Sequence, residues 1–272
     1  MSAPYDLAMW MNHHRHKDKK LPYFYLYHSR SDAHSVELCL LITHDLLKAC
    51  SPMRHQAALG QIAYGVNVEH FWASSSKAKS LDLAIGIPKE EPLITGDMRR
   101  VASNRRKSGE GPSVERNVFS KILIACEAKA VMTEHGKSQP RIFDELSSSH
   151  EIVHKGDSTT IAAGIAMVNV AAKFASPLRQ NDASTIHFSQ HKQPTVTERM
   201  VNHLRGLRIR DRIDDVGFDA FCTFVVDCDN QSQCTLYTAS PAPQPGDKDH
   251  YDTFIERISR CYSERFSALP ER

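Results

Sequence analysis

The ten residues Ile122-Leu-Ile-Ala-Cys-Glu-Ala-Lys-Ala-Val131 decide the fold expected of this chain. The run is apolar, carries β-branched residues near both ends and is bounded by polar sequence, which predicts a strand. Glu127 and Lys129 interrupt it two positions apart, so on a strand both side chains project from the same face. A strand this apolar is expected to be covered on both faces, where unpaired charges are costly. The two charges must therefore serve each other, a metal ion or a substrate.

A second strand-like run, Ser80-Leu-Asp-Leu-Ala-Ile-Gly-Ile-Pro88, precedes the first and carries one acid, Asp82. A Glu-x-Lys triplet alone is most simply an ion pair at a strand end, because patterns of three residues recur by chance. The position of the triplet favours a functional role, because an arginine-rich loop separates it from the strand that carries Asp82.

The order of an Asp on one strand and Glu-x-Lys on the next resembles the core of the PD-(D/E)xK nuclease superfamily, which includes many restriction endonucleases. The resemblance covers residues 35–172 at the level of element order and rests on Asp82, Glu127 and Lys129. Leu81 precedes Asp82, at the position where the motif that names the family has a proline. The resemblance implies an α/β fold with a restriction-endonuclease-like core, in which helices flank a mixed central sheet, here followed by a C-terminal strand and helix elaboration.

The resemblance also implies roles for these residues. Asp82 and Glu127 would hold Mg²⁺, for which Mn²⁺ can substitute, with the backbone carbonyl of Ala128 as a further ligand and Glu37 on the first core helix as an additional candidate. Carboxylate and carbonyl oxygens are hard ligands that suit Mg²⁺. Lys129 would orient or deprotonate the attacking water and stabilise the developing charge, because phosphodiester hydrolysis needs both.

Basic residues gather in the loop of residues 89–117 and beside a helix expected at 139–154. Arginine suits both phosphate oxygens and guanine edges, and long loops in compact domains are usually functional or disordered. If the loop is more than a solvated insertion, the residues expected to contact DNA are Arg99, Arg100, Arg105, Arg106, Lys107, Lys137 and Arg141. Asp97, in the same loop, is the alternative to Asp82 as the first acid.

The composition is that of a soluble globular protein, with 272 residues of which 41% are hydrophobic and 24% charged. The net charge is only +2, so any anion-binding surface must come from local clusters. Seven cysteines without a Cys-x-x-Cys pair indicate buried reduced thiols rather than a zinc site. The chain shows neither a signal peptide nor an apolar run that could span a bilayer, so we expect a cytoplasmic protein without a membrane partner.

The chain divides into an N-terminal arm, residues 1–34, and a single nuclease domain, residues 35–272. The domain comprises a catalytic core at about 35–175 and a C-terminal elaboration at about 195–272. Apolar periodicity predicts helices at 35–50, 139–154, 195–213 and 251–266, and strands at 160–172, 218–228 and 235–238. Residues 51–79 are expected to be helix and connection.

The expected function is a Mg²⁺-dependent endodeoxyribonuclease acting on double-stranded DNA, as a type II restriction enzyme or a related phage-defence nuclease. Because duplex sites have two-fold symmetry, we expect a homodimer. Two alternatives stay open: a non-catalytic nucleic-acid-binding protein of the same fold, and a metal-dependent nucleotide phosphohydrolase built on His44 and Asp45. The presence of Asp82, Glu127 and Lys129 together favours the nuclease.

Overall fold

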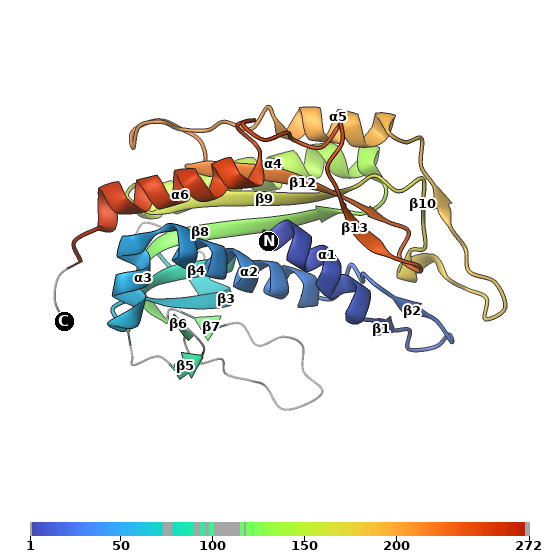
Figure 1. Ribbon diagram of the computed structural model, residues 1–272, viewed down its shortest axis with the longest axis horizontal. Coiled ribbons are helices and arrows are strands. Elements are labelled where there is room, and N and C mark those ends of the chain that lie inside the picture. The colour runs from blue at the N-terminus through green and yellow to red at the C-terminus, as the bar shows by residue number, and fades with distance from the viewer. Residues whose placement is uncertain are drawn as a thin grey trace.

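A nine-stranded mixed sheet runs through the middle of the molecule (Figure 1). The computed structural model describes residues 2–72, 78–89, 93–95, 98–100, 115–116 and 118–269. In spatial order the strands are β13 (Cys234–Tyr237), β12 (Ala220–Cys228), β9 (Ile161–Asn169), β8 (Phe119–Val131), β4 (Lys79–Pro88), β3 (Ala63–His70), β6 (Met98–Arg100) and β5 (Leu93–Thr95), and β7 (Glu115–Arg116) pairs with β3.

The centre of the sheet changes from antiparallel to parallel at β8. Strands β3, β4 and β8 follow one another as antiparallel neighbours, whereas β9 and β12 run parallel to β8. A parallel neighbour requires a crossover, and the connection from β8 to β9 is helix α4 (His135–Gly156). This helix lies over the strand that carries Glu127 and Lys129, which places its side chains within reach of both.

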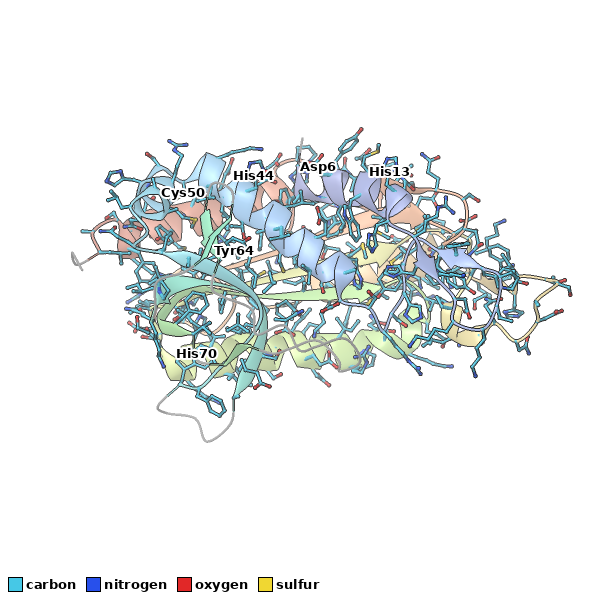
Figure 2. All side chains as sticks on the ribbon, turned by 90° about the horizontal axis from the view of Figure 1, so that it is seen from below. Asp6, His13, His44, Cys50, Tyr64 and His70 are labelled. Atoms are coloured by element: carbon cyan, nitrogen blue, oxygen red, sulfur yellow. The ribbon has the colours of Figure 1, made fainter. Side chains whose placement is uncertain are left out.

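Helices cover both faces of the sheet. One face carries α1 (Ala3–His13), α2 (Ala33–Ala49), α3 (Ser51–Ala58) and α6 (Tyr251–Phe266), and the other carries α4 and α5 (Thr195–Leu204). Figure 2 shows this separation, with α1 and α2 on one side of the strands and α4 on the other. The remaining short elements are β1 (His16–Lys17), β2 (Phe24–Tyr25), β10 (Lys173–Phe174), β11 (Ser189–Gln190) and a 3-10 turn, η1 (Pro177–Arg179).

The side chains of β8 alternate between these two faces, as a strand requires. Cys126 and Ala128 pack into the core beneath α1, α2 and α6, whereas Ala125 and Val131 pack into the core beneath α4 and α5. Glu127 and Lys129 share the second orientation, so both project toward α4. The predicted α/β class, the mixed sheet between helices and the strands carrying Asp82 and Glu127 are therefore confirmed.

Two predictions from the sequence are wrong in part. Residues 51–79 contain the central strand β3 besides helix α3, because the mixed pattern of residues 61–72 reflects a strand buried on both faces. The helix expected at 195–213 ends at Leu204, and residues 205–213 turn away to bring Arg210 into a buried ion pair.

Residues 3–13, expected to belong to an N-terminal arm, form helix α1 and pack into the main core. Leu7 and Met11 are fully buried, and α1 contacts both α2 and β13. Asn12 Nδ2 donates to the carbonyl of Cys234 at 2.8 Å, and its Oδ1 accepts from the N–H of the same residue at 2.7 Å. The helix therefore lies against the edge strand of the sheet. All seven cysteines are buried and unbridged, as the sequence predicts.

A buried carboxylate joins β9, β12 and α6. Asp219 is fully buried and accepts hydrogen bonds from Arg210 Nε at 2.9 Å, Arg265 Nη2 at 2.6 Å and the N–H of Ala162 at 2.8 Å. Burial opposes the ionisation of Asp219, but hydrogen bonds from His154, Arg210 and Arg265 outweigh it and hold the pKa of the carboxyl well below its ordinary value. Among the described helices, none is both long and apolar enough to cross a membrane.

We expect Asp219→Ala to lower the free energy of unfolding at pH 7 by about 3–5 kcal/mol, because the arginines lose their buried counterion. Urea denaturation of the two proteins measures this difference.

The stability that the Asp219 charge contributes depends on pH. Because the pKa of Asp219 is depressed in the folded protein, this stability is present above the ordinary pKa near 3.8 and is lost as the pH falls through the folded-state value. The stability gap between the wild type and Asp219→Asn should therefore narrow below about pH 4, and a gap independent of pH would contradict this account.

Candidate active site at the divergence of two strands

The site begins where β4 separates from β8. Their backbone pairing ends at Leu83 and Cys126. At the preceding residue of β4, Asp82, the side-chain carboxylate takes the place of the backbone acceptor. Asp82 Oδ2 accepts a hydrogen bond from the N–H of Ala128 at 2.7 Å. Because the N–H and C=O of one strand residue face the same neighbour, the carbonyl of Ala128 also faces Asp82. A carboxylate and a peptide carbonyl thus both face the gap between the strands.

The partner strand β3 bends at the same level. Val66 pairs with Leu83 and Val68 with Leu81, so Asn67 lies opposite Asp82, and its φ of 53° lies in the left-handed region. Asparagine tolerates this conformation better than most residues. Figure 2 shows β3 passing from Tyr64, on the side of α2, to His70, on the side of α4.

The bent end of the hairpin rests on α4. The indole of Trp72 lies so close to Gly156 that a Cβ there would be 2.1 Å from Trp72 Cγ. His70 and Trp72 form an edge-to-face ring pair with centroids 4.7 Å apart. The hairpin therefore curls across the face of the sheet onto which Glu127 and Lys129 project, and it carries Lys79 to them.

Glu127 is the centre of a charged cluster. It is 7% exposed, and Lys129 Nζ lies 2.7 Å from its Oε1. Lys79 Nζ lies 2.9 Å from Oε2, which also accepts a hydrogen bond from Ser149 Oγ at 3.1 Å. Three donors from β4, β8 and α4 thus converge on one nearly buried carboxylate.

The two acids of the cluster respond oppositely to their surroundings. Burial, together with the negative charge of Glu127, raises the pKa of Asp82 to about 6. Burial also opposes the ionisation of Glu127, but the charges of Lys129 and Lys79 outweigh it and hold the pKa of Glu127 below its ordinary value. Two carboxylates that repel each other favour a cation between them, and a carboxylate pair beside lysines suits chemistry on a phosphate.

Helix α4 extends the cluster along one face. Glu145 Oε2 lies 3.4 Å from Lys129 Nζ, and Arg141 Nη1 lies 2.8 Å from Glu145 Oε1. Positions 137, 141, 145 and 149 are four residues apart, so their side chains share one side of the helix. The predicted DNA-binding residues Lys137 and Arg141 both belong to this row.

The structure does not bring every predicted residue to the cluster. Glu37 lies on α2, which covers the opposite face; burial raises the pKa of Glu37, and the opposing charge acting on it is that of His14. Arg99 and Arg100 lie on β6, of which the backbone is described. The remaining predictions in that loop lie outside the described residues: Asp97, Arg105, Arg106 and Lys107.

Three members of the cluster were not predicted as site residues: Lys79, Glu145 and Ser149. Lys79 precedes Asp82 by three positions and stands at the start of the same strand, a signal that could have suggested it. Glu145 and Ser149 carried no sequence signal, because their approach depends on how α4 packs over β8.

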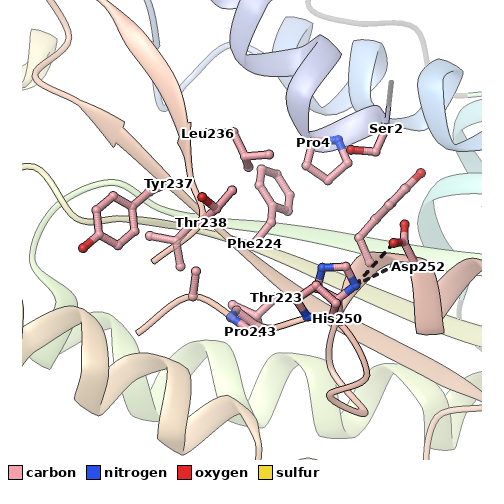
Figure 3. Close-up of a pocket in the computed structure, with 14 residues that line it drawn as sticks. Ser2, Pro4, Thr223, Phe224, Leu236, Tyr237, Thr238, Pro243, His250 and Asp252 are labelled. Atoms are coloured by element: carbon pink, nitrogen blue, oxygen red, sulfur yellow. Dashed lines mark hydrogen bonds and ion pairs between the residues drawn. The ribbon is translucent and has the colours of Figure 1, made fainter. Parts of the chain in front are cut away.

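A separate hollow of about 170 Å³ lies on the other side of the sheet, between α1, β12, β13 and the start of α6 (Figure 3). Its lining is largely apolar and includes Phe224, Leu236 and Pro243. The dashed lines in Figure 3 join His250 and Asp252, which form an ion pair at 3.7 Å. This hollow lacks the convergent acids and lysines of the Glu127 cluster.

Comparison of the chain with protein-family models, with curated proteins and with solved structures finds no match. Within the residues that the structure describes, no three His, Cys, Asp or Glu side chains stand together as a metal-binding group. The arrangement at Asp82 and Glu127 has two carboxylates and a carbonyl, which is a different donor set.

We expect the backbone conformation of Asn67 to matter more than its side chain. Asn67→Gly retains the positive φ, whereas Asn67→Val places a β-branched residue in the left-handed region and should cost about 1–3 kcal/mol of stability. Urea denaturation measures both variants. An equal loss in both would instead assign the effect to the hydrogen bond, 2.8 Å long, from Asn67 Nδ2 to Asp32 Oδ2.

Proposed function

We propose that this protein is a metal-dependent endonuclease that hydrolyses phosphodiester bonds of double-stranded DNA. The observation that carries the proposal is the convergence of Asp82, Glu127 and Lys129 at the divergence of β4 and β8. Asp82 accepts a hydrogen bond from the N–H of Ala128, the residue between Glu127 and Lys129, and those two side chains form an ion pair at 2.7 Å. A type II restriction enzyme or a related phage-defence nuclease is the form of this activity that we favour, acting as a homodimer on two-fold symmetric sites.

The order of the elements supports a restriction-endonuclease-like core of the PD-(D/E)xK type. Helix α2 precedes the antiparallel strands β3, β4 and β8, and α4 then leads to β9, which runs parallel to β8. Asp82 lies on the second of these strands, and Glu127 and Lys129 lie on the third. The resemblance read from the sequence required this order of an acid on one strand and Glu-x-Lys on its neighbour.

The residues present fit a divalent cation such as Mg²⁺. Asp82, Glu127 and the carbonyl of Ala128 offer hard oxygen donors. Burial and, after it, the negative charge of Glu127 raise the pKa of Asp82, and a cation would offset both effects. When bound, such an ion would neutralise phosphate charge and acidify water. Mn²⁺ has similar ligand preferences and is expected to substitute.

The lysines supply the remaining requirements of phosphodiester hydrolysis. The pKa of Lys129 is raised, because the attraction of Glu127 outweighs the effect of burial, so its ammonium is charged at neutral pH. A charged ammonium can orient the attacking water and stabilise the charge that develops on the phosphate oxygens. Lys79 supplies a second positive charge on the other oxygen of Glu127, where it can do the same for a phosphate that enters the gap.

The geometry does not favour the phosphohydrolase alternative. The carboxylate of Asp45 accepts hydrogen bonds from the N–H of Ala3 at 2.9 Å and from the hydroxyl of Tyr251 at 2.8 Å. Asp45 therefore joins the start of α1 to α6, away from the face that carries Glu127. The binding-only alternative differs from the proposal in one observable, the cleavage of DNA.

Purified protein incubated with plasmid and phage DNA should cleave in the presence of Mg²⁺ and not in EDTA. Lys129→Ala and Glu127→Ala should each lower the rate by at least about 100-fold, because charge stabilisation and proton transfer each contribute that much or more. Gel electrophoresis measures the rate, and discrete bands indicate a site-specific enzyme.

Lys121→Ala is the matched control, since Lys121 lies on the same strand and forms an ion pair with Asp157 at 3.7 Å, at the far end from Glu127. Cleavage that survives Lys129→Ala would reject the proposed site. Near wild-type cleavage by Asp82→Ala together with loss in Asp97→Ala would reassign the first acid. The absence of cleavage of modified or unmodified DNA with any divalent metal would favour the binding-only alternative.

A further inference from the structure

A second charged feature lies at the N-terminus of α4, at the end of the sheet toward which β8 points (Figure 1). It is a surface hollow of about 580 Å³, which we call the basic hollow. Two segments form it, residues 133–137 and 179–196. Its lining includes the charged and imidazole side chains of Glu134, Lys137, Arg179, His191 and Lys192.

The basic hollow is held in shape by hydrogen bonds. His191 lies 3.0 Å from the hydroxyl of Thr133 through Nε2 and 3.0 Å from the carbonyl of Ala171 through Nδ1. Behind it, the nearly buried His135 lies 2.7 Å from the carbonyl of Asn169, and the rings of His135 and His191 stand edge to face at 5.2 Å. The two walls are therefore fixed to the end of β9 and to the start of α4.

The charge of the basic hollow is positive. Lys137 Nζ lies 2.9 Å from Glu134 Oε2, and Arg179 forms an ion pair with the other oxygen of the same carboxylate. Lys192 also lines the hollow, so its lining has three cationic side chains and one carboxylate. The first turn of a helix of 22 residues opens beside it, and helix N-termini add a partial positive charge.

A row of charged and polar side chains connects the basic hollow to the Glu127 cluster. Lys137, Arg141, Glu145 and Ser149 follow one another at four-residue intervals on α4, and Ser149 donates to Glu127. Twelve residues of α-helix rise by about 18 Å. Along a DNA duplex that distance corresponds to about five base pairs at roughly 3.4 Å each.

We propose that the basic hollow binds the sugar–phosphate backbone of duplex DNA about five base pairs from the bond that is cut. This inference rests on the proposed function, because the Glu127 cluster defines where the scissile phosphate lies. A volume of about 580 Å³ exceeds that of a single phosphate group, and arginine beside lysine suits successive phosphates of one strand. The contact is with the backbone, so it holds the duplex in register and is independent of base sequence.

The test measures DNA binding in EDTA, so that it does not depend on catalysis. Fluorescence anisotropy of a labelled 30-base-pair duplex, titrated at several salt concentrations, compares the wild type with Arg179→Ala/Lys192→Ala. We expect the double variant to bind about tenfold or more weakly at 0.1 M salt. The slope of log affinity against log salt should fall in magnitude by about 2, because each lost phosphate contact removes about one unit.

The matched control lies on the opposite face of the sheet. Lys48→Ala removes a lysine that is largely exposed on α2, pairs with Asp45 at 3.9 Å and should leave binding and slope unchanged. Circular dichroism establishes that the double variant is folded, and Lys192→Glu, a single surface change, provides a second measure that should weaken binding more than Lys192→Ala.

Three results would overturn the inference. They are binding by the double variant within twofold of the wild type, a salt slope that does not change, and a wild type that binds an RNA duplex more tightly than DNA through the same residues. The outcomes also separate this inference from the proposed function. Loss of binding by the variants of a protein that never cleaves would support the basic hollow and reject the nuclease. Cleavage by the wild type, with unaltered DNA binding by the variants, would support the nuclease and reject the basic hollow as a DNA-binding site.

Discussion

The hydrogen bond from the N–H of Ala128 to the carboxylate of Asp82 is the interaction on which the site depends. A buried amide on a central strand must have an acceptor, and here a side chain provides it instead of the neighbouring backbone. The neighbouring strand is then released to bend with its partner, and the bend carries Lys79 over Glu127. Because a side-chain carboxylate takes the place of a backbone acceptor, the gap opens with an acid in it, and Lys79 adds a positive charge from the neighbouring strand.

The charges around the gap balance one another in the protein alone. Glu127 forms ion pairs with two lysines, and Lys129 forms ion pairs with two carboxylates. Asp82 accepts a hydrogen bond from a backbone amide and is affected by the negative charge of Glu127. These mutual ion pairs explain how so many charges are tolerated beneath α4.

The sequence was sufficient for those parts of the fold and site that depend on local pattern. Apolar periodicity located the strands of Asp82 and Glu127 and the final helix, and residue spacing placed Glu127 and Lys129 on one face. Other features depend on contacts between distant segments. In the sequence, Asn67 is indistinguishable from an ordinary strand residue, and only the strand pairing shows that it lies opposite Asp82. Ser149 reaches Glu127 only through the packing of α4. The burial of α1 likewise depends on β13, more than 200 residues later.

The contact between α1 and β13 has a consequence for the behaviour of the protein in solution. A sheet that ends in an exposed strand offers unpaired backbone groups to any other extended chain, and this is a common route to aggregation. The side-chain amide of Asn12 occupies both the N–H and the C=O of Cys234, much as a further strand would. Helix α1 thus covers the edge strand at Cys234, so the first residues of the chain limit the association of this edge with other molecules.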